Sequence, residues 1–266
     1  MPELVERDHV RQVREFYDRE AERYLGQRYG TDEPGVARPY RERMAHILEL
    51  LDRKGGDALD VGCGPGVLLA SLVDHEFRVT AVDLSREMAI RARAKVRGDR
   101  PQSITSFGTA VADALPFRDG SFDVVTCIGV VSYWPDLDAG FRELARVLKP
   151  NGLLVIQASN KLALWEYENR LVRIPYQELK TRLTGKDVRD YKFKLRAYRP
   201  GYFEQHLAGA GFRVETRRFY DHRIPFLGLF AKGASNSFSE KMAARPRVPF
   251  GTRLASGFVV KAVKSR

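Results

Sequence analysis

The chain has 266 residues, of which 44% are hydrophobic and 30% charged, an ordinary balance for a globular protein of one large domain or one domain with an insertion. No stretch approaches the ~18 uninterrupted apolar residues of a membrane-spanning helix, and the mixed charge of residues 1–10 argues against a secretory signal. The two cysteines, Cys63 and Cys127, form neither a CxxC pair nor a Cys/His cluster, so we expect reduced thiols in the cytoplasm and no metal site.

The basic charge is concentrated in the C-terminal part of the chain. Residues 1–159 carry 22 Lys and Arg against 25 Asp and Glu, whereas residues 160–266 carry 23 against 9. The whole net charge of +11 therefore comes from the second part. Such a surface attracts an anionic substrate, a nucleic acid or an acidic membrane face. A well-solvated basic surface without a specific partner explains the charge equally well.

Two helices are expected in an N-terminal helical segment, residues 1–55. In residues 4–25, apolar and aromatic side chains recur at helical spacing among charges, and glycine and proline between residues 26 and 35 interrupt the pattern. Residues 38–53 have a second apolar face, and the following pair of glycines ends that helix.

Short strands and helices alternate in residues 56–159, which predicts a core with a parallel, doubly wound α/β sheet. The expected strands are residues 58–61, 78–83, 105–111, 122–128 and 153–157. The expected helices between them are residues 67–73, 85–97 and 136–148.

The alternation lapses in residues 160–198, which are rich in charge, tyrosine and tryptophan, and we expect an inserted cap or lid there. Residues 199–266 are expected to complete the core sheet. They are predicted to form a helix at residues 200–210 and strands at 212–220 and 254–264, the last strand following a connection that contains Pro, Lys and Arg.

The strongest local signal is the run LDVGCGPG at residues 59–66, which leaves a predicted strand and enters a predicted helix. Glycines there let the backbone turn sharply and approach a ligand closely. Asp83 ends the next strand, where a carboxylate can bind both hydroxyls of a ribose. Two details disfavour a nicotinamide dinucleotide: Val67 stands where a third glycine belongs, and Asp60 would repel the pyrophosphate.

Together with its neighbours, this run resembles the class I S-adenosylmethionine-dependent methyltransferases over residues 40–160 and 200–264. LDVGCGPG is similar to the first motif of the family, VDLS at residues 82–85 to the second, and VADALPF at residues 111–117 to the third. The runs FDVV and ELARVLKPNG resemble the signatures of the fourth strand and of the segment before the fifth, although many relatives have a second glycine at Leu153.

The resemblance implies a seven-stranded, mostly parallel sheet with an antiparallel last strand. It also implies S-adenosylmethionine as the cofactor, with S-adenosylhomocysteine as product. This cofactor carries an ammonium and a sulfonium group and no phosphate, which fits a carboxylate at Asp60. By the same resemblance, Asp83 holds the ribose, and Asp113 accepts a hydrogen bond from the adenine amino group beside the backbone of Ala112.

A further resemblance concerns the N-terminal run FYDREAERY, which is similar to a helix that closes over the cofactor in small-molecule methyltransferases. Tyr17 and Tyr24 are the matching positions, and plain core packing by an aromatic helix face is the alternative. The cofactor contacts implied in all are Tyr17, Tyr24, Asp60, Gly62, Cys63, Gly64, Gly66, Asp83, Leu84, Ala112, Asp113 and Cys127.

Methyl transfer is an in-line displacement, so the enzyme must mainly align the acceptor and exclude water. A base is needed only for a hydroxyl or carbon acceptor. His222 follows a predicted strand at its ligand end and is the candidate base, against a surface or structural role; the other histidines fall on predicted outer helices. Tyr133 and Trp134 follow the fourth strand, where they can line the acceptor pocket, contact the sulfonium or simply pack in the loop.

Acceptor choice is expected to depend on the cap and on residues 224–230. The cap mixes aromatic with basic residues, which suits stacking with nucleic acid or a pocket for an anionic or aromatic metabolite. The apolar run 224–230 suits a lipid-like tail, peripheral membrane contact or the core. Residues 127–130 read CIGV, unlike the Asn/Asp-Pro-Pro-Tyr motif of enzymes that methylate base amines.

The leading hypothesis is a cytoplasmic methyltransferase for a small-molecule acceptor, anionic or lipid-linked. An RNA methyltransferase that uses the basic C-terminal part is one alternative, and a non-catalytic S-adenosylmethionine-binding protein is another. The sequence does not predict the acceptor atom or the oligomeric state.

Overall fold

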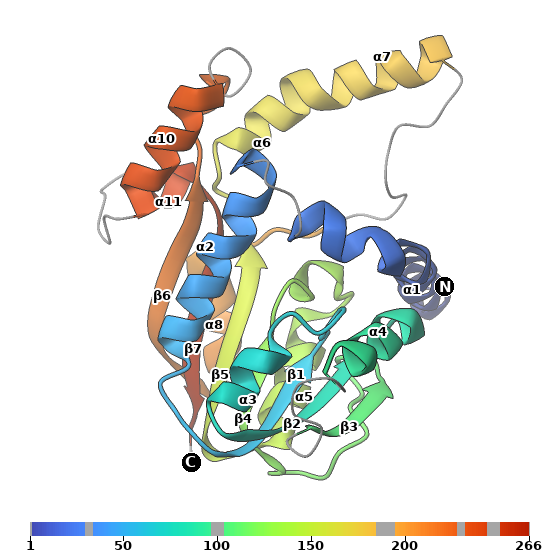
Figure 1. Ribbon diagram of the computed structural model, residues 1–266, viewed down its shortest axis with the longest axis vertical. Coiled ribbons are helices and arrows are strands. Elements are labelled where there is room, and N and C mark those ends of the chain that lie inside the picture. Colours follow the sequence, from blue (N-terminus) through green and yellow to red (C-terminus); the bar gives the residue numbers. More distant parts are fainter. Residues whose placement is uncertain are drawn as a thin grey trace.

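A seven-stranded sheet forms the centre of the computed structural model, which describes residues 2–29, 34–96, 104–184, 195–227, 232–243 and 251–265. Its spatial order is β3-β2-β1-β4-β5-β7-β6 (Figure 1). The strands are β1 (Gly56–Val61), β2 (Phe77–Asp83), β3 (Ile104–Thr109), β4 (Phe122–Cys127), β5 (Leu148–Ser159), β6 (Phe212–His222) and β7 (Ala255–Lys264). Neighbours from β3 to β5 pair in parallel, and β7 pairs antiparallel with β5 and β6. The predicted mostly parallel sheet with an antiparallel last strand is confirmed.

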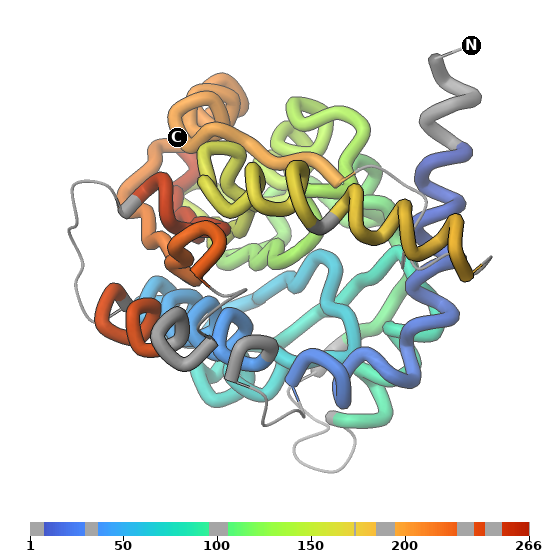
Figure 2. Tube along the Cα trace, turned by 90° about the horizontal axis from the view of Figure 1, so that it is seen from above, coloured from blue at the N-terminus to red at the C-terminus, as the bar shows by residue number. Residues whose placement is uncertain are grey.

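Helices cover both faces of this sheet, as Figure 1 shows. One layer holds α2 (Pro34–Leu50), α3 (Leu69–Asp74) and α4 (Arg86–Val96), and the other holds α5 (Leu137–Val147) and α8 (Pro200–Gly209). The long N-terminal helix α1 (Pro2–Arg28) contacts α4 and α2 and stands at one side of the molecule in Figure 2.

Two hydrophobic cores lie between the sheet and these layers because successive residues of a strand point to opposite faces. Ala58 of β1 faces the core under α2 and α3, and the next residue, Leu59, faces the core under α5 and α8. Val124 and Val125 of β4 divide in the same way. The strand runs therefore read as continuously apolar, which is typical of a sheet buried on both faces.

The fifth strand is longer than expected, because it begins before the Pro150-Asn151-Gly152 sequence that was predicted to precede it. Its register against β4 shifts, so that Phe122 pairs with Leu148 and Val124 already pairs with Leu153. The extra residues form a bulge, and Asn151 takes a positive φ of 60° there. A turn-forming sequence is thus accommodated inside the strand.

Residues 160–198, predicted as a cap, contain α6 (Trp165–Glu168), the π-helical turn η3 (Asn169–Arg173) and α7 (Ile174–Thr184). In Figure 1, α7 extends away from the body of the molecule, beyond the carboxyl ends of the strands. Two short helices, α10 (Lys232–Ala243) and α11 (Gly251–Leu254), lie in the stretch that was predicted only as a connection. Among the helices of the described ranges, none is both long and apolar enough to cross a membrane.

Candidate cofactor-binding and active site

A cavity of about 850 Å³, including its open mouth, lies at the carboxyl ends of β1 to β4 and against α1. The chain leaves β1 toward β2 on one side, whereas β4 pairs with β1 on the other. Such a reversal of strand order opens a crevice in which ligands of doubly wound sheets bind. Loops after all four strands contribute to the lining, together with the 3-10 turn η2 (Val131–Tyr133).

The turn after β1 presents bare backbone to this cavity. Gly62 has φ +73°, and a Cβ atom on it would lie 2.0 Å from a methyl group of Val130. Gly64 has φ +52° with open space where a Cβ would stand. The turn is fixed to β2, because the amides of Gly62 and Cys63 donate to the Val82 carbonyl at 2.8 and 3.0 Å. Only glycine combines this left-handed backbone with such close approach.

Asp83 is held rigidly at the end of β2. One of its carboxylate oxygens accepts from the Gly64 amide and the other from the Ser85 amide, each at 2.8 Å. Burial nevertheless raises the pKa of Asp83 to about 6. Leu84, Ala112 and Asp113 extend the same wall of the cavity past β3. Two carboxylates thus stand along the β2–β3 side.

Helix α1 forms the opposite wall with Val10, Val13, Tyr17 and Tyr24. It is fixed to its neighbours by side-chain hydrogen bonds. The Asp18 carboxylate accepts from the Ser85 hydroxyl at 2.6 Å at the start of α4, and the His9 Nε2 atom donates to the Tyr133 carbonyl at 2.9 Å.

Aromatic side chains meet where α1 crosses η2. The hydroxyls of Tyr17 and Tyr133 are hydrogen-bonded, and their rings are edge to face with centroids 5.5 Å apart. The ring of Tyr24 packs on the ring of Tyr17, with the two centroids 6.1 Å apart. Burial, followed by the nearby Tyr133, raises the pKa of Tyr17 far above its usual value. Tyr17 is therefore a neutral phenol at physiological pH, able to donate a hydrogen bond but not to act as a base.

Most of the predicted cofactor residues line this cavity, and four lie behind its wall. The lining includes Tyr17, Tyr24, Gly62, Gly64, Asp83, Leu84, Ala112 and Asp113, as well as Tyr133 and Trp134. The four residues outside the lining are Asp60, Cys63, Gly66 and Cys127.

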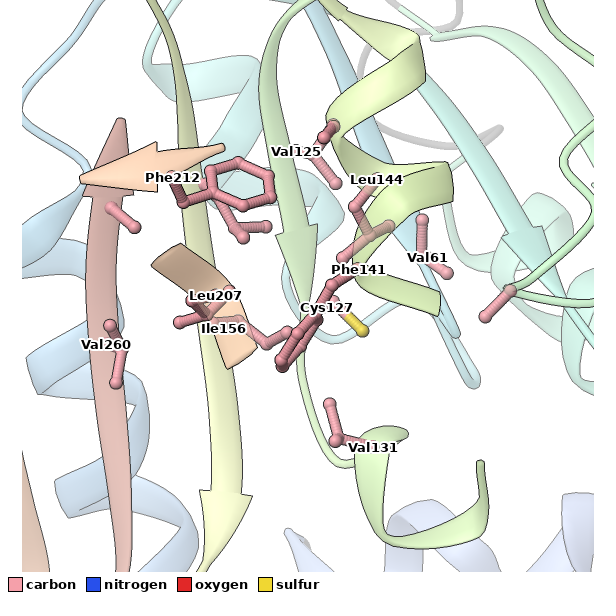
Figure 3. Close-up of a cluster of buried hydrophobic side chains, with 14 of the residues drawn as sticks. Val61, Val125, Cys127, Val131, Phe141, Leu144, Ile156, Leu207, Phe212 and Val260 are labelled. Atoms are coloured by element: carbon pink, nitrogen blue, oxygen red, sulfur yellow. The ribbon is translucent and has the colours of Figure 1, made fainter. Parts of the chain in front are cut away.

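These four residues support the site from within the fold. Asp60 is only 3% exposed and accepts from the Thr126 hydroxyl at 2.7 Å, and burial raises its pKa to about 7. Gly66 packs toward α4, since a Cβ there would come within 3.1 Å of the Ala92 Cα. Both cysteines are buried, which raises the pKa of each thiol. Cys127 lies among the core side chains in Figure 3, beside Phe141.

His222 is separated from the cavity, contrary to the expectation that it would stand beside the acceptor. It does end a strand that points the same way as β5, but β5 and β7 lie between β6 and β4. Its Nδ1 atom lies 3.9 Å from a Glu42 carboxylate oxygen, and burial lowers the pKa of the ring. The sequence predicts the direction of a strand more readily than its position in the sheet. The position of β6 at the edge of the sheet is what separates His222 from the cavity.

His9, Val10 and Val13 of the α1 wall are not among the site residues that the sequence predicts, and the sequence pattern places His9 on an outer helix. The signal was present, because His9, Val13 and Tyr17 follow one another at a spacing of four residues and so share a helix face. The cap contributes no described residue to the cavity lining; Tyr191 and Phe193, and residues 228–230, lie outside the described residues.

Comparison with known proteins agrees with this geometry. Residues 59–156 match the family model described as "Methyltransferase domain". The ubiquinone biosynthesis O-methyltransferase of Xanthomonas oryzae pv. oryzae (strain PXO99A) is 38% identical over 125 residues, covering 45% of this chain and 49% of that protein. A demethylmenaquinone methyltransferase of Desulfitobacterium hafniense (strain Y51) is 30% identical over 148 residues, covering 52% and 58%. The chain thus spans about half the length of these curated relatives.

Among solved structures, magnesium protoporphyrin IX methyltransferase (ChlM) from Synechocystis PCC 6803 with bound SAH superposes with a TM-score of 0.62 at 15% identity. The match covers 97% of this chain and 100% of that one, and at this identity it shows a shared fold. Residues 59–156 therefore match a methyltransferase domain, and the chain shares the fold of solved methyltransferases.

The residues present fit the cofactor of this family. The bare backbone at Gly62 and Gly64 permits close approach of a ligand. At the end of the neighbouring strand β2, Asp83 offers a carboxylate that is fixed by the amides of Gly64 and Ser85. The wall contains carboxylates and aromatic rings but no lysine or arginine among the lining residues described. A lining of carboxylates and aromatic rings attracts a cationic nucleoside, whereas it would repel the negative charge of a pyrophosphate.

Proposed function

We propose that the protein transfers a methyl group from S-adenosylmethionine to a small-molecule acceptor. The observation that carries this proposal is the single cavity that joins the Gly62–Gly64 turn and Asp83 to the aromatic wall of Tyr17 and Tyr133. The curated relatives support it, since their names describe a ubiquinone biosynthesis O-methyltransferase and a demethylmenaquinone methyltransferase. We assign the activity to the cytoplasm, because both cysteines are free thiols.

On the cofactor side, we assign Asp83 to the ribose hydroxyls and Asp113 to the adenine amino group. The two backbone hydrogen bonds that fix Asp83 support this role, because they hold the carboxylate in place before the ligand arrives. When bound, the cofactor supplies an electrophilic methyl group on its sulfonium. The protein then needs to present the acceptor atom in line with that methyl group.

On the acceptor side, we assign alignment and exclusion of water to Tyr17, Tyr133 and Trp134. Val10, Val13 and the aromatic rings make this part of the lining largely apolar, which suits a planar or lipid-like acceptor. No histidine lines the cavity among the residues described, and Tyr17 is a neutral phenol. An acceptor atom that is already nucleophilic at neutral pH suits this site best.

The test is to incubate the protein with methyl-labelled S-adenosylmethionine and a cell extract divided into polar metabolites, lipids and RNA. Label in the metabolite or lipid fraction is expected, and mass spectrometry then identifies the product. Label confined to RNA would replace the small-molecule proposal with a nucleic-acid substrate. Cofactor binding without label in any fraction would support a non-catalytic binding protein.

A further inference from the structure

Helix α7 of the cap buries none of its eleven side chains. It extends beyond the carboxyl ends of the strands, away from the two helical layers that cover the sheet (Figure 1). A helix of this length is only marginally stable in water by itself, because tertiary packing supplies most of the stability of helices in proteins. A surface that packs against α7 would therefore stabilise it.

Four apolar side chains form a row along this segment, which we call the α7 stripe. They are Val172, at the end of η3, and Tyr176, Leu179 and Leu183 of α7. Their spacing of four, three and four residues places them on one helix face. Each is exposed, by fractions from 37% to 77%. Single apolar side chains are ordinary on a protein surface, whereas a contiguous row of them marks an interaction site.

Basic side chains border the α7 stripe on both sides. By the geometry of a helix, Lys180 lies on one side of the stripe and Arg182 on the other, and both are exposed. Glu178, the acidic residue of α7, lies farther round the helix. The sequence around α7 is basic as well, since residues 169–199 contain 10 Lys and Arg against 3 Asp and Glu. The surface that covers the stripe must therefore be apolar at its centre and negative at its border.

An anionic lipid bilayer combines these two properties. Its acyl chains accept aliphatic side chains, the level of its headgroups accepts tyrosine, and its negative lipids attract lysine and arginine. A second copy of this chain would instead bring the same excess of positive charge to the contact. A nucleic acid offers phosphates, but its backbone provides no apolar surface for Val172, Leu179 and Leu183.

We propose that α7 docks the protein on an anionic lipid membrane, with the α7 stripe in the interface and Lys180 and Arg182 at the headgroups. The cavity also lies at the carboxyl ends of the strands, so this docking turns the cavity end of the sheet toward the bilayer. The inference concerns a surface outside the cavity. It goes beyond the function proposed above and does not depend on it.

The experiment measures co-sedimentation of the full chain with two kinds of vesicle, phosphatidylcholine alone and equal parts of phosphatidylcholine and phosphatidylglycerol. Leu179→Asp places a charge in the middle of the stripe. The double variant Lys180→Gln/Arg182→Gln removes the flanking cations and leaves the stripe intact. Thermal unfolding followed by circular dichroism checks that each variant folds, and Leu179→Ser replaces Leu179→Asp if the latter does not.

Helix α4 provides matched controls away from the cap. Ile90 is 46% exposed there, so Ile90→Asp makes the same change of polarity and charge as Leu179→Asp, which alters a side chain 55% exposed. Arg93→Gln/Lys95→Gln removes one exposed arginine and one exposed lysine at the same spacing as the pair on α7.

We expect the wild type to bind the mixed vesicles about tenfold or more tightly than phosphatidylcholine alone, with affinity that falls as salt is added. Leu179→Asp should abolish most of the binding, and Lys180→Gln/Arg182→Gln should weaken binding to the mixed vesicles by about tenfold. Both α4 controls should bind like the wild type.

Three results would overturn the inference. The first is a wild type that binds neither kind of vesicle, or binds both equally. The second is an equal loss of binding in the α4 controls, which would make the attraction a property of total charge. The third is a different occupant: a dimer in analytical ultracentrifugation that Leu179→Asp makes monomeric, or binding of oligouridylate in place of vesicles. Failure of methyl transfer would leave the vesicle result unaffected.

Discussion

The two walls of the cavity are built in different ways. The wall at β1 to β3 consists of backbone turns and strand-end carboxylates that follow one another closely in the chain, from Gly62 to Asp113. The wall at α1 and η2 consists of side chains that meet from far apart: Tyr17 and Tyr133 are separated by 116 positions, and His9 and Tyr133 by 124. A local sequence motif can therefore specify the first wall, whereas only the packing of α1 creates the second.

The strongest test of the first wall is Gly62→Ala. The new Cβ would collide with Val130, and the residue would have to keep a positive φ, a strain of about 1–3 kcal/mol before any repacking. We expect S-adenosylhomocysteine affinity to fall by about 100-fold or more in calorimetry. Gly209→Ala is the control, because a Cβ there meets nothing within 4 Å. Unchanged affinity in Gly62→Ala would show that the turn does not contact the ligand.

Asp83→Ala should have the next largest effect. Loss of the fixed carboxylate that we assign to the two ribose hydroxyls should weaken cofactor binding by about 1–3 kcal/mol. The measurement is again calorimetry with S-adenosylhomocysteine, with Asp57→Ala as a control on β1, away from the cavity lining. An affinity equal to that of the wild type would remove Asp83 from the site.

The pH dependence of binding tests the same carboxylate in the unmodified protein. Because burial raises the pKa of Asp83 to about 6, its ionised form is lost below that pH. The affinity for S-adenosylhomocysteine should be constant above about pH 7 and fall by up to about tenfold per pH unit below pH 6. Asp60, with a pKa of about 7, titrates nearby, so the Asp60→Asn variant should keep the profile and Asp83→Asn should lose it.

The raised pKa of Asp83 affects the stability of the ligand-free protein in the opposite direction. A rise in pH should favour cofactor binding but lower the free energy of unfolding. The unfolded carboxyl ionises near pH 4, whereas the folded one remains protonated up to about pH 6. The contribution of Asp83 to the free energy of unfolding should therefore fall as the pH rises from about 4 to about 6. Urea titrations of the wild type and Asp83→Asn across this range would show the difference, and parallel curves would contradict it.

The smallest effect on turnover is expected from His222→Ala, which lies outside both walls. Once an acceptor is known, kcat/KM should stay within about twofold of the wild type. The free energy of unfolding should fall by about 1–3 kcal/mol, because a buried side chain is removed beside Glu42 and Asp221. A large loss of kcat without loss of stability would restore His222 as a base.

Much of the first wall could be predicted from the sequence, because continuous apolar runs mark buried strands and the residues that follow them must lie at one edge of the sheet. Asp83 was predicted in this way, whereas Asp113 was predicted from the resemblance of residues 111–117 to the third motif of the family. His222 could not be placed, since the insertion of β7 between β5 and β6 depends on pairing between distant segments.

The burial of both cysteines has a practical consequence for experiments on the cap. Their thiol pKa values are raised, so the reactive thiolate is scarce at neutral pH and the folded protein should react slowly with maleimides. The chain has no other cysteine. Tyr176 on α7 is 64% exposed. A cysteine introduced there would accept a fluorescent or spin label with little background, and the native thiols need no change. The signal of that label could then follow the cap during ligand binding.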